Sequence, residues 1–441
     1  MRICVYAISR NEEKFVERFC RAAKDADLIL VADTGSTDMT VPMLGDLREK
    51  EGIPIVVHHI TVKPWRFDLA RNAAMTLIPA NFDVCISLDL DEELQPGWRE
   101  EIEKVWTEGT TRLRYKFDWG VGIVFYYEKI HARHGYRWHH PCHEYPTPYG
   151  IDEKYAQSDM LLVIHKPDST KSRGQYLNLL KMSVEEDPLD PRNAFYYARE
   201  LSFNSRYDES ITECRRYLAL PRADWPNERC YAYRTMGRCY AAKGDLAGSE
   251  KSFLQAAMEA PNTREPWFEL AALMYRQRRW AESLAFILRC LSIKDRELVY
   301  TVDPEVWGAQ VHDYAAIAAF YLDLKPLAVE HARKAVEMDP HNPRYMNNLS
   351  FCEAMGAPPP APIVEEGRGV WIGPTPNIIH FVWFTGPQSR PFSFINFLAI
   401  HRAHEIQKPD AIFMYCNEEP MNNPHWEAIR EFVTIVHVDY S

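Results

Sequence analysis

The stretch VCISLDLDEEL, residues 84–94, decides how the amino-terminal part of the chain is expected to fold. A short apolar run, Val84 to Leu88, is typical of a buried strand, and Asp89 and Asp91 follow it. Because alternate side chains of a strand share a face, the two carboxylates are expected to project together from its carboxyl end. They would repel each other unless a cation joined them, and oxygen ligands suit Mg²⁺ or Mn²⁺. Taken alone, an Asp-x-Asp in this place is also typical of a solvated turn.

Strand and helix patterns alternate in the residues before this stretch. Apolar runs predict strands and amphipathic segments predict helices, in the order 3–8, 12–24, 28–32, 36–50, 53–58 and 67–77. Ser36-Thr37-Asp38 is expected to supply the N-cap of the second helix. Such alternation predicts a mainly parallel sheet, in which ligands bind beyond the carboxyl ends of the strands. Ser9, Asp33 and the 89–91 pair all fall there.

Short motifs in this region resemble those of the family 2 glycosyltransferases, which have the GT-A fold, a nucleotide-binding α/β domain. The motifs are ISRNEE (8–13), VADTGSTD (31–38), FDLARN (67–72) and LDLDEE (88–93). The family has a second Asp where this chain has Thr34, a departure that we expect to be tolerated. The order and spacing of the motifs carry the resemblance.

The resemblance implies a role for each matching residue. Ser9 and Asp33 would hold the base and ribose of a nucleoside diphosphate, and Arg71 would lie near the diphosphate. Asp89 would face the ribose and the metal, and Asp91 would bind the metal directly. A divalent cation and Arg71 would stabilise the charge that develops on the departing diphosphate. Seen singly, Arg71 is as typical of a helix surface, and Asp33 of a turn.

Residues 112–165 are dense in aromatic, histidine and arginine side chains, and we expect them to form the acceptor half of the site. The segment WHHPCHE, residues 138–144, resembles the "VHE" element of a glycosyltransferase subgroup related to peptide S-glycosyltransferases. In that subgroup the Glu takes a proton from the acceptor, so the resemblance implies that Glu144 is the general base. Otherwise Glu144 is a solvated loop residue or an ion-pair partner of Arg133 or Arg137.

His165 ends the apolar run LLVIH, residues 161–165. GT-A enzymes often complete the metal site with a histidine from a late strand, so its place implies a metal ligand beside Asp89 and Asp91. A lone histidine after a strand is also a common structural residue. A competing possibility is a zinc site built from one loop, with His139, His140, Cys142 and His143 as ligands. The spacing is too tight for common zinc patterns, and one loop rarely supplies four ligands.

Residues 171–356 have a purely helical pattern with an internal repeat. Gly237 and Ala271 occupy equivalent places in two copies and lie 34 residues apart, which is the tetratricopeptide period. Looser copies flank them, around Ala198 and around Ala316, with an insertion expected at 296–304. Small residues would let paired helices approach closely while aromatic side chains fill the gaps. The array is expected to be a spacer, or a platform for the acceptor, a protein partner or self-association.

Residues 357–441 begin with APPPAPIVEEGRG, which is typical of a linker. A strand at 375–387, an amphipathic helix at 393–406 and a strand at 411–420 are expected to follow. This region resembles the opening of a second glycosyltransferase domain, of the sugar-binding kind that contains an Asp-x-Asp motif. The sequence ends before an acidic pair, so the resemblance implies an incomplete, inactive domain of a bifunctional protein. Its sheet edge would need covering.

Composition restricts the class of protein. The length of 441 residues favours roughly two to four domains. A net charge of −11 argues against a nucleic-acid binder. No apolar run approaches the roughly 20 residues of a membrane span, and the amino terminus lacks the pattern of a signal peptide. The 10 scattered cysteines predict small buried side chains in a reducing compartment, so a cytoplasmic location is expected.

The sequence therefore predicts a multidomain protein: an α/β GT-A nucleotide-binding domain at 1–170, an all-α tetratricopeptide-repeat solenoid at 171–356 and a partial α/β segment at 357–441. The leading hypothesis is an inverting glycosyltransferase that depends on Mn²⁺ or Mg²⁺. It would move a sugar from a nucleoside diphosphate sugar, most simply a UDP-sugar, to a glycan or another hydroxyl acceptor. Inversion follows from the resemblance and from one candidate base without a paired nucleophile. The alternatives are a tetratricopeptide adaptor with an inactive, nucleotide-binding GT-A domain, and a hydrolase or nucleotidyltransferase on a related fold.

Overall fold

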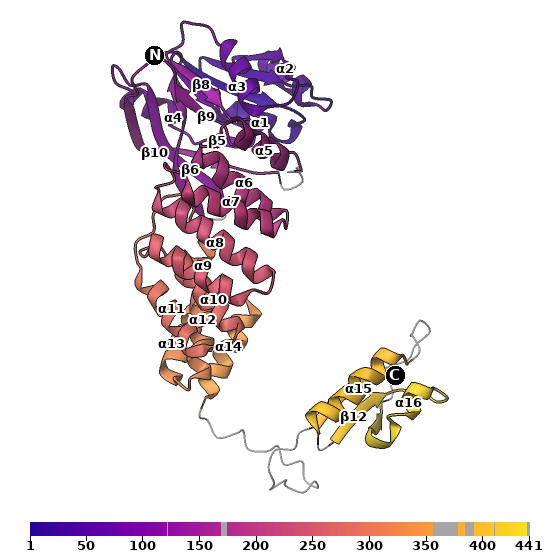
Figure 1. Ribbon diagram of the computed structural model, residues 1–441. Coiled ribbons are helices and arrows are strands. Elements are labelled where there is room, and N and C mark those ends of the chain that lie inside the picture. Colours follow the sequence, from indigo (N-terminus) through magenta and orange to yellow (C-terminus); the bar gives the residue numbers. More distant parts are fainter. Residues whose placement is uncertain (121, 169–173, 356–377, 384–391, 410, 439–441) are drawn as a thin grey trace. The chain divides into compact units, whose positions relative to one another are not determined.

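The chain forms two compact units, Met1–Gly356 and Ala357–Ser441, in a computed structural model (Figure 1). The structure describes residues 1–441 except 121, 169–173, 356–377, 384–391, 410 and 439–441. The larger unit contains a mixed sheet followed by a helical array, so the protein is multidomain, as predicted.

The sheet of the larger unit has eight strands in the order β3-β2-β1-β4-β7-β6-β10-β5. Their bounds are β1 Ile3–Ser9, β2 Leu28–Asp33, β3 Ile55–His59, β4 Val84–Ser87, β5 Glu92–Leu94, β6 Arg112–Gly120, β7 Ile123–Ala132 and β10 Tyr155–His165. Strands β3, β2, β1 and β4 are parallel, as the alternating pattern predicts. Beyond β4 the sheet is mixed, which the prediction of a mainly parallel sheet missed. The connection between β6 and β7 is too short for a parallel crossover and makes an antiparallel hairpin.

The central strands are buried on both faces, which explains their nearly continuous apolar runs. Along β1, Val5 packs in the core that includes side chains of α1 (Glu13–Ala22), α2 (Thr40–Glu51) and α4 (Trp98–Val105). The next residue, Tyr6, packs in the opposite core with α3 (Phe67–Thr76). Helices therefore cover both faces, and the polar residues that end the strands lie at the carboxyl edge of the sheet.

The expectation that Ser36-Thr37-Asp38 caps α2 is met only by Asp38, whose carboxylate accepts from the backbone N–H of Thr40, the first residue of α2. The N-cap residue is Met39, which makes no side-chain cap. The hydroxyl of Ser36 donates to Asp33, and the carboxylate of Asp38 accepts from the backbone N–H groups of Glu13 and Thr40 at 3.2 and 3.0 Å. The segment ties the end of β2 to the start of α1, a tertiary role that local propensity does not reveal.

A helical array completes the larger unit (Figure 1). Its helices are α5 Tyr176–Glu186, α6 Pro191–Phe203, α7 Tyr207–Ala219, α8 Pro226–Ala242, α9 Leu246–Glu259, α10 Glu265–Arg276, α11 Trp280–Ser292, α12 Ala309–Tyr321, α13 Lys325–Met338 and α14 Pro343–Ala354. From α6 onward they pack as consecutive hairpins, α6 with α7 through α12 with α13, and short connections make each pair antiparallel. The first helices of successive pairs also contact each other and form one layer.

The small residues of the repeat lie where the helices of a pair cross, which confirms the predicted repeats. A Cβ added to Gly237 would lie 2.3–2.9 Å from ring atoms of Phe253, so only glycine fits the observed approach of α8 and α9. In the pair formed by α10 and α11, Ser283 Oγ donates to the carbonyl oxygen of Ala271 at 2.9 Å. The predicted insertion is also confirmed, since residues 293–308 separate α11 from α12 and contain one 3-10 turn.

The smaller unit has a three-stranded parallel sheet, in the order β11-β12-β13. Its elements include β11 Ile378–Trp383, α15 Phe394–Gln407, β12 Ala411–Cys416, α16 Pro424–Glu427 and β13 Thr434–His437. Ile400 of α15 packs with Met414 of β12 and Trp426 of α16 in its core. The predicted linker at 357–369 lies outside the described residues. That this unit opens a second glycosyltransferase domain stays a prediction.

All 10 cysteines are buried, as their scattered placement in apolar segments predicts. Cys4 and Cys85, for example, lie at paired positions of β1 and β4 in the sheet core. Within the described ranges, no helix combines the length and the apolarity that a membrane crossing requires.

Candidate functional site

The first three strands end at the same level of the sheet. Ser9, Asp33 and His59 are paired across β1, β2 and β3, and each is the last residue of its strand. Ser9 Oγ donates to Asp33 Oδ1 at 3.0 Å. The two residues predicted to bind the base and ribose are therefore in direct contact at the carboxyl edge.

Asp33 organises the loop that follows β2. Its side chain is 1% exposed, and Oδ2 accepts from the backbone N–H groups of Gly35 and Ser36, both at 3.0 Å. Burial alone would raise the pKa of Asp33, but the hydrogen bonds from Ser36, Gly35 and Ser9 outweigh it and lower the pKa. The structure thus gives Asp33 a local role as a buried carboxylate, and its contact with a nucleotide stays a prediction.

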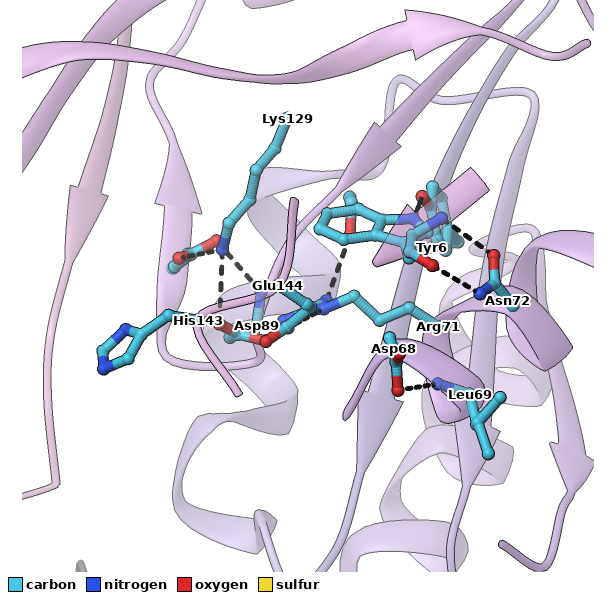
Figure 2. A network of polar contacts seen from close by, with 12 residues as sticks. Tyr6, Asp68, Leu69, Arg71, Asn72, Asp89, Lys129, His143 and Glu144 are labelled. Atoms are coloured by element: carbon cyan, nitrogen blue, oxygen red, sulfur yellow. Dashed lines mark hydrogen bonds and ion pairs between the residues drawn. The ribbon is translucent and has the colours of Figure 1, made fainter. Parts of the chain in front are cut away.

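Arg71 of α3 joins three segments that are distant in the sequence (Figure 2). Its Nη2 donates to Asp89 Oδ1 at 2.6 Å, its Nε to Glu144 Oε1 at 2.5 Å and its Nη1 to Ser87 Oγ at 3.1 Å. The guanidinium lies 5.0 Å from the ring centroid of Trp138 and is 3% exposed. Burial would lower its pKa, but the charges of Asp89 and Glu144 raise it well above the ordinary value.

Arg71 is therefore the ion-pair partner of Glu144, in place of Arg133 or Arg137. Arg133 instead donates to the carbonyl oxygen of Ile78 in the loop after α3. All three nitrogens of the Arg71 guanidinium are engaged by protein groups. In this structure the residue links the donor and acceptor sides, and its contact with a diphosphate stays a prediction.

Lys129 of β7 is a second buried cation, and the sequence analysis missed it. Its Nζ lies 3.0 Å from Glu92 Oε1 and 3.4 Å from Asp89 Oδ2, and Glu92 Oε2 accepts from the backbone N–H of Asp89 at 3.0 Å (Figure 2). Burial raises the pKa of Glu92, whereas for Asp89 the charges of Arg71 and Lys129 outweigh burial and lower the pKa. The sequence feature that could have indicated this buried cation is the presence of a lysine within the apolar segment of β7. The Asp89 side chain remains 40% exposed, so a ligand can reach it.

Asp91 and His165 form a separate pair, with His165 Nε2 3.5 Å from Asp91 Oδ2. The ring of Trp119 lies 4.4 Å from the His165 ring, centroid to centroid. Burial would lower the pKa of His165, but the hydrogen bond and charge of Asp91 outweigh it and raise the pKa. The other ring nitrogen, Nδ1, is buried and has no hydrogen-bond partner among the described residues.

The predicted metal ligands are thus divided between two groups. Asp91 and His165 lie together and offer an oxygen and a nitrogen, whereas both oxygens of Asp89 face Arg71 and Lys129. Within the described ranges, no three His, Cys, Asp or Glu side chains are grouped as metal ligands. Asp91 and His165 fit a divalent cation as two ligands, and Asp89 fits as a third only if it leaves Lys129.

The residues of the competing zinc hypothesis are dispersed. Cys142 is buried in the core of the first helices, and His140 Nε2 lies 3.6 Å from Asp190 Oδ2. The ring of His143 stacks on Tyr196 of α6 at 4.0 Å. These side chains therefore belong to the packing between the sheet region and the array.

The turn that carries Glu144 connects β8 (Tyr136–His139) to β9 (Tyr145–Pro148). His140 and His143 have φ values of 80° and 53°, which non-glycine residues adopt at a cost of about 1 kcal/mol or more. Arg192 of α6 donates from Nε and Nη2 to the carbonyl oxygen of His143, both at 3.3 Å. The first helix of the first pair, α6, therefore holds the strained turn that presents Glu144 to Arg71.

A chain of hydrogen bonds runs behind the site through the sheet core. Trp138 Nε1 donates to the hydroxyl of Tyr6, which lies 2.8 Å from His131 Nε2, and His131 Nδ1 lies 2.8 Å from the carbonyl oxygen of Ala132. The carbonyl can only accept, so Nδ1 carries the proton and Tyr6 donates to Nε2. This network requires a neutral imidazole.

Acidification is expected to destabilise the sheet region through His131. Burial lowers its pKa from the ordinary 6.5 to about 4, so the unfolded chain takes up this proton at higher pH than the folded protein. The neutral His131 imidazole therefore makes its full contribution to the free energy of unfolding above pH 6.5, and this contribution is lost as the pH falls toward 4. We expect the free energy of unfolding to be about 2 kcal/mol lower at pH 5 than at pH 7 through this residue.

Hydrogen exchange of the β1 and β4 amides at both pH values measures this loss. In His131→Gln the remaining groups titrate as before. The difference in the free energy of unfolding between pH 7 and pH 5 is therefore expected to be about 2 kcal/mol smaller than in wild type. An identical pH dependence in the two proteins would show that His131 does not carry the effect.

Comparisons with known proteins find likeness only among solved structures. No model of a protein family matches the chain, and no curated protein matches it. A structure described as YrrB, a TPR protein with an unusual peptide-binding site, is 13% identical and has a TM-score of 0.33; the match covers 40% of this chain and 84% of YrrB. PilW, described as a widely conserved type IV pilus biogenesis factor, is 17% identical with a TM-score of 0.34, over 40% of this chain and 74% of PilW. A thermophilic TPR protein of Thermus thermophilus is 15% identical with a TM-score of 0.29, over 41% of this chain and 91% of that protein. The helix pairs described above, rather than these likenesses, identify the repeats.

Proposed function

We propose that the amino-terminal sheet region is a glycosyltransferase that uses a nucleoside diphosphate sugar, most simply a UDP-sugar. The observation that carries the proposal is the position of Arg71, which holds Asp89 of the expected donor side and Glu144 of the expected acceptor side. These groups come from three separate segments and meet at the carboxyl edge of the parallel strands, where α/β proteins bind ligands.

In the proposed reaction, a hydroxyl oxygen of the acceptor attacks the anomeric carbon of the donor sugar. The bond between that carbon and the diphosphate oxygen breaks, and the diphosphate leaves with the electron pair. The proton of the hydroxyl passes to the free oxygen of Glu144, since Oε1 is held by Arg71. A single displacement of this kind inverts the anomeric configuration. A divalent cation at Asp91 and His165 would supply positive charge to the leaving diphosphate.

Nucleotide and metal are expected to stabilise the protein together. UDP with Mn²⁺ at about 100 times its dissociation constant adds about 2.7 kcal/mol, which raises the melting temperature, and EDTA removes the metal-dependent part. Asp91→Ala should lose that part because it removes one of the two paired ligands. The control is Asp46→Ala, because the Asp46 carboxylate is exposed on α2. This variant should behave as wild type. The measurement is a thermal shift of the full chain.

Two outcomes would contradict the proposal in different ways. A full metal-dependent shift in Asp91→Ala would show that the metal binds elsewhere. The absence of a shift with any nucleotide would favour the alternative function, an adaptor that acts through the helical array. Binding of a protein partner or self-association by the array is compatible with either outcome.

A further inference from the structure

The insertion at residues 293–308, here called the strap, lies along the first helices of three successive repeats. Tyr300 contacts Tyr196 of α6, with ring centroids 6.3 Å apart, and its hydroxyl donates to Glu228 of α8. Further along, the backbone N–H of Asp303 donates to Glu265 Oε1 of α10 at 3.0 Å. The strap therefore lies along the layer formed by the first helices of these pairs.

Ion pairs and backbone bonds fix the strap in this place. Asp303 Oδ2 lies 3.4 Å from Nη2 of Arg234 and 3.3 Å from Nη2 of Arg238, both on α8. Arg264, which precedes α10, donates to the carbonyl oxygens of Ile293 and Val306 at 2.9 and 3.1 Å. An array that served only as a spacer would not need a segment anchored across three of its repeats.

The strap also reaches the sheet region. Arg296 donates to the carbonyl oxygen of Gly122, which immediately precedes β7, and the ring of Tyr300 lies 6.2 Å from that of Phe125, edge to face. Both contacts fall on the hairpin of β6 and β7. Through them the strap itself joins the array to the hairpin.

Aromatic rings continue from this hairpin to the candidate site. The ring of Phe125 lies 5.5 Å from that of Phe117, and Phe117 lies 6.1 Å from His165. Trp119, on the same strand as Phe117, lies 4.4 Å from His165. A displacement of the hairpin would therefore move the side chains that pack against His165, the partner of Asp91.

We propose that the strap positions the β6–β7 hairpin over the Asp91–His165 side of the site, with Tyr300 and Arg296 as positioning residues. The helical array is then part of the active unit rather than a spacer. The effect on transfer rests on the proposed function, whereas the effect on the hairpin does not.

Hydrogen exchange of the full chain tests the positioning directly. Tyr300→Ala and, separately, Arg296→Ala are expected to raise the exchange rates of backbone amides at 123–127 by about tenfold, with β1 and β4 unchanged. Arg289→Ala is the matched control, because Arg289 on α11 also donates to a carbonyl oxygen, that of Pro261, but lies outside the strap. Arg296 is exposed, so its variant should fold even if the loss of the Tyr300 ring disturbs the core.

Transfer kinetics add a second readout. The two strap variants should weaken the metal-dependent part of UDP binding and slow transfer, because the hairpin packs against His165, the partner of Asp91. Unchanged exchange at 123–127 in both variants would overturn the proposal, whether or not the protein proves to be a transferase. Faster exchange without any nucleotide binding would uphold the positioning role and count against the proposed function alone.

Discussion

Replacing Arg71 by methionine is expected to lower the free energy of unfolding of the sheet region by about 3–5 kcal/mol. The guanidinium is 3% exposed and is the shared partner of Asp89 and Glu144. Methionine is an unbranched side chain that can fill much of the same space, but it leaves Glu144 without its cation and Asp89 with Lys129 alone. The loss therefore comes mainly from Glu144, whose side chain is 9% exposed and stays buried after its partner is removed.

Hydrogen exchange of the β1 and β4 amides measures this loss without interference from the helical array. Arg48→Met is the matched control, since Arg48 is 53% exposed on α2 and pairs only with Glu49 among the described residues, so the expected loss is below about 1 kcal/mol. Arg71→Lys should fall between the two, because it keeps the charge but not the fork that spans both carboxylates. A loss below about 1 kcal/mol in Arg71→Met would show that Arg71 does not hold the site together.

Replacing Glu144 by glutamine is expected to reduce sugar transfer by about 10²–10⁴-fold. In Glu144→Gln the side-chain amide oxygen can still accept from Arg71 Nε, so the turn keeps its place while the basic carboxylate is lost. UDP affinity should stay as in wild type, because Glu144 lies on the expected acceptor side. The measurement pairs single-turnover transfer with UDP binding.

Glu93→Gln is the control for this substitution. Glu93 lies in β5 near the acidic pair, but it faces Arg18 at 3.5 Å rather than Arg71. Its replacement should change transfer less than about twofold, the scale of an exposed ion pair. Transfer at the wild-type rate in Glu144→Gln would place the base elsewhere, with Glu92 and Asp118 as the next residues to test.

The sequence was sufficient for features that depend on neighbours along the chain. The apolar runs located β1, β2 and β4, and parallel pairing then placed Ser9 beside Asp33. The 34-residue spacing of small side chains located the repeats, because close approach of α8 and α9 leaves no room for a Cβ at Gly237. In both cases the pattern along the chain is compatible with only one local arrangement of strands or helices.

Contacts that depend on the order of the strands in the sheet could not be predicted from the sequence. Lys129 meets Asp89 and Glu92 only because β7 joins the sheet beside β4, a pairing that no local pattern encodes. For the same reason, neither the partner of Glu144 nor the separation of Asp89 from the Asp91–His165 pair followed from the motifs. The cap expected of residues 36–38 was only partly right, because Ser36 bonds Asp33 and the Asp38 carboxylate is shared between the starts of α1 and α2.

The contacts of the strap have a consequence for the order in which the protein matures. Gly122 and Phe125 emerge from the ribosome early, but Arg296 and Tyr300 are synthesised only after three helical pairs have begun to form. Contacts between such distant residues form late, because a long loop must close first. A nascent chain released before Tyr300 would carry every residue of the candidate site and still lack the contacts of the strap with its hairpin, so the proposed positioning begins only after α11 has been synthesised.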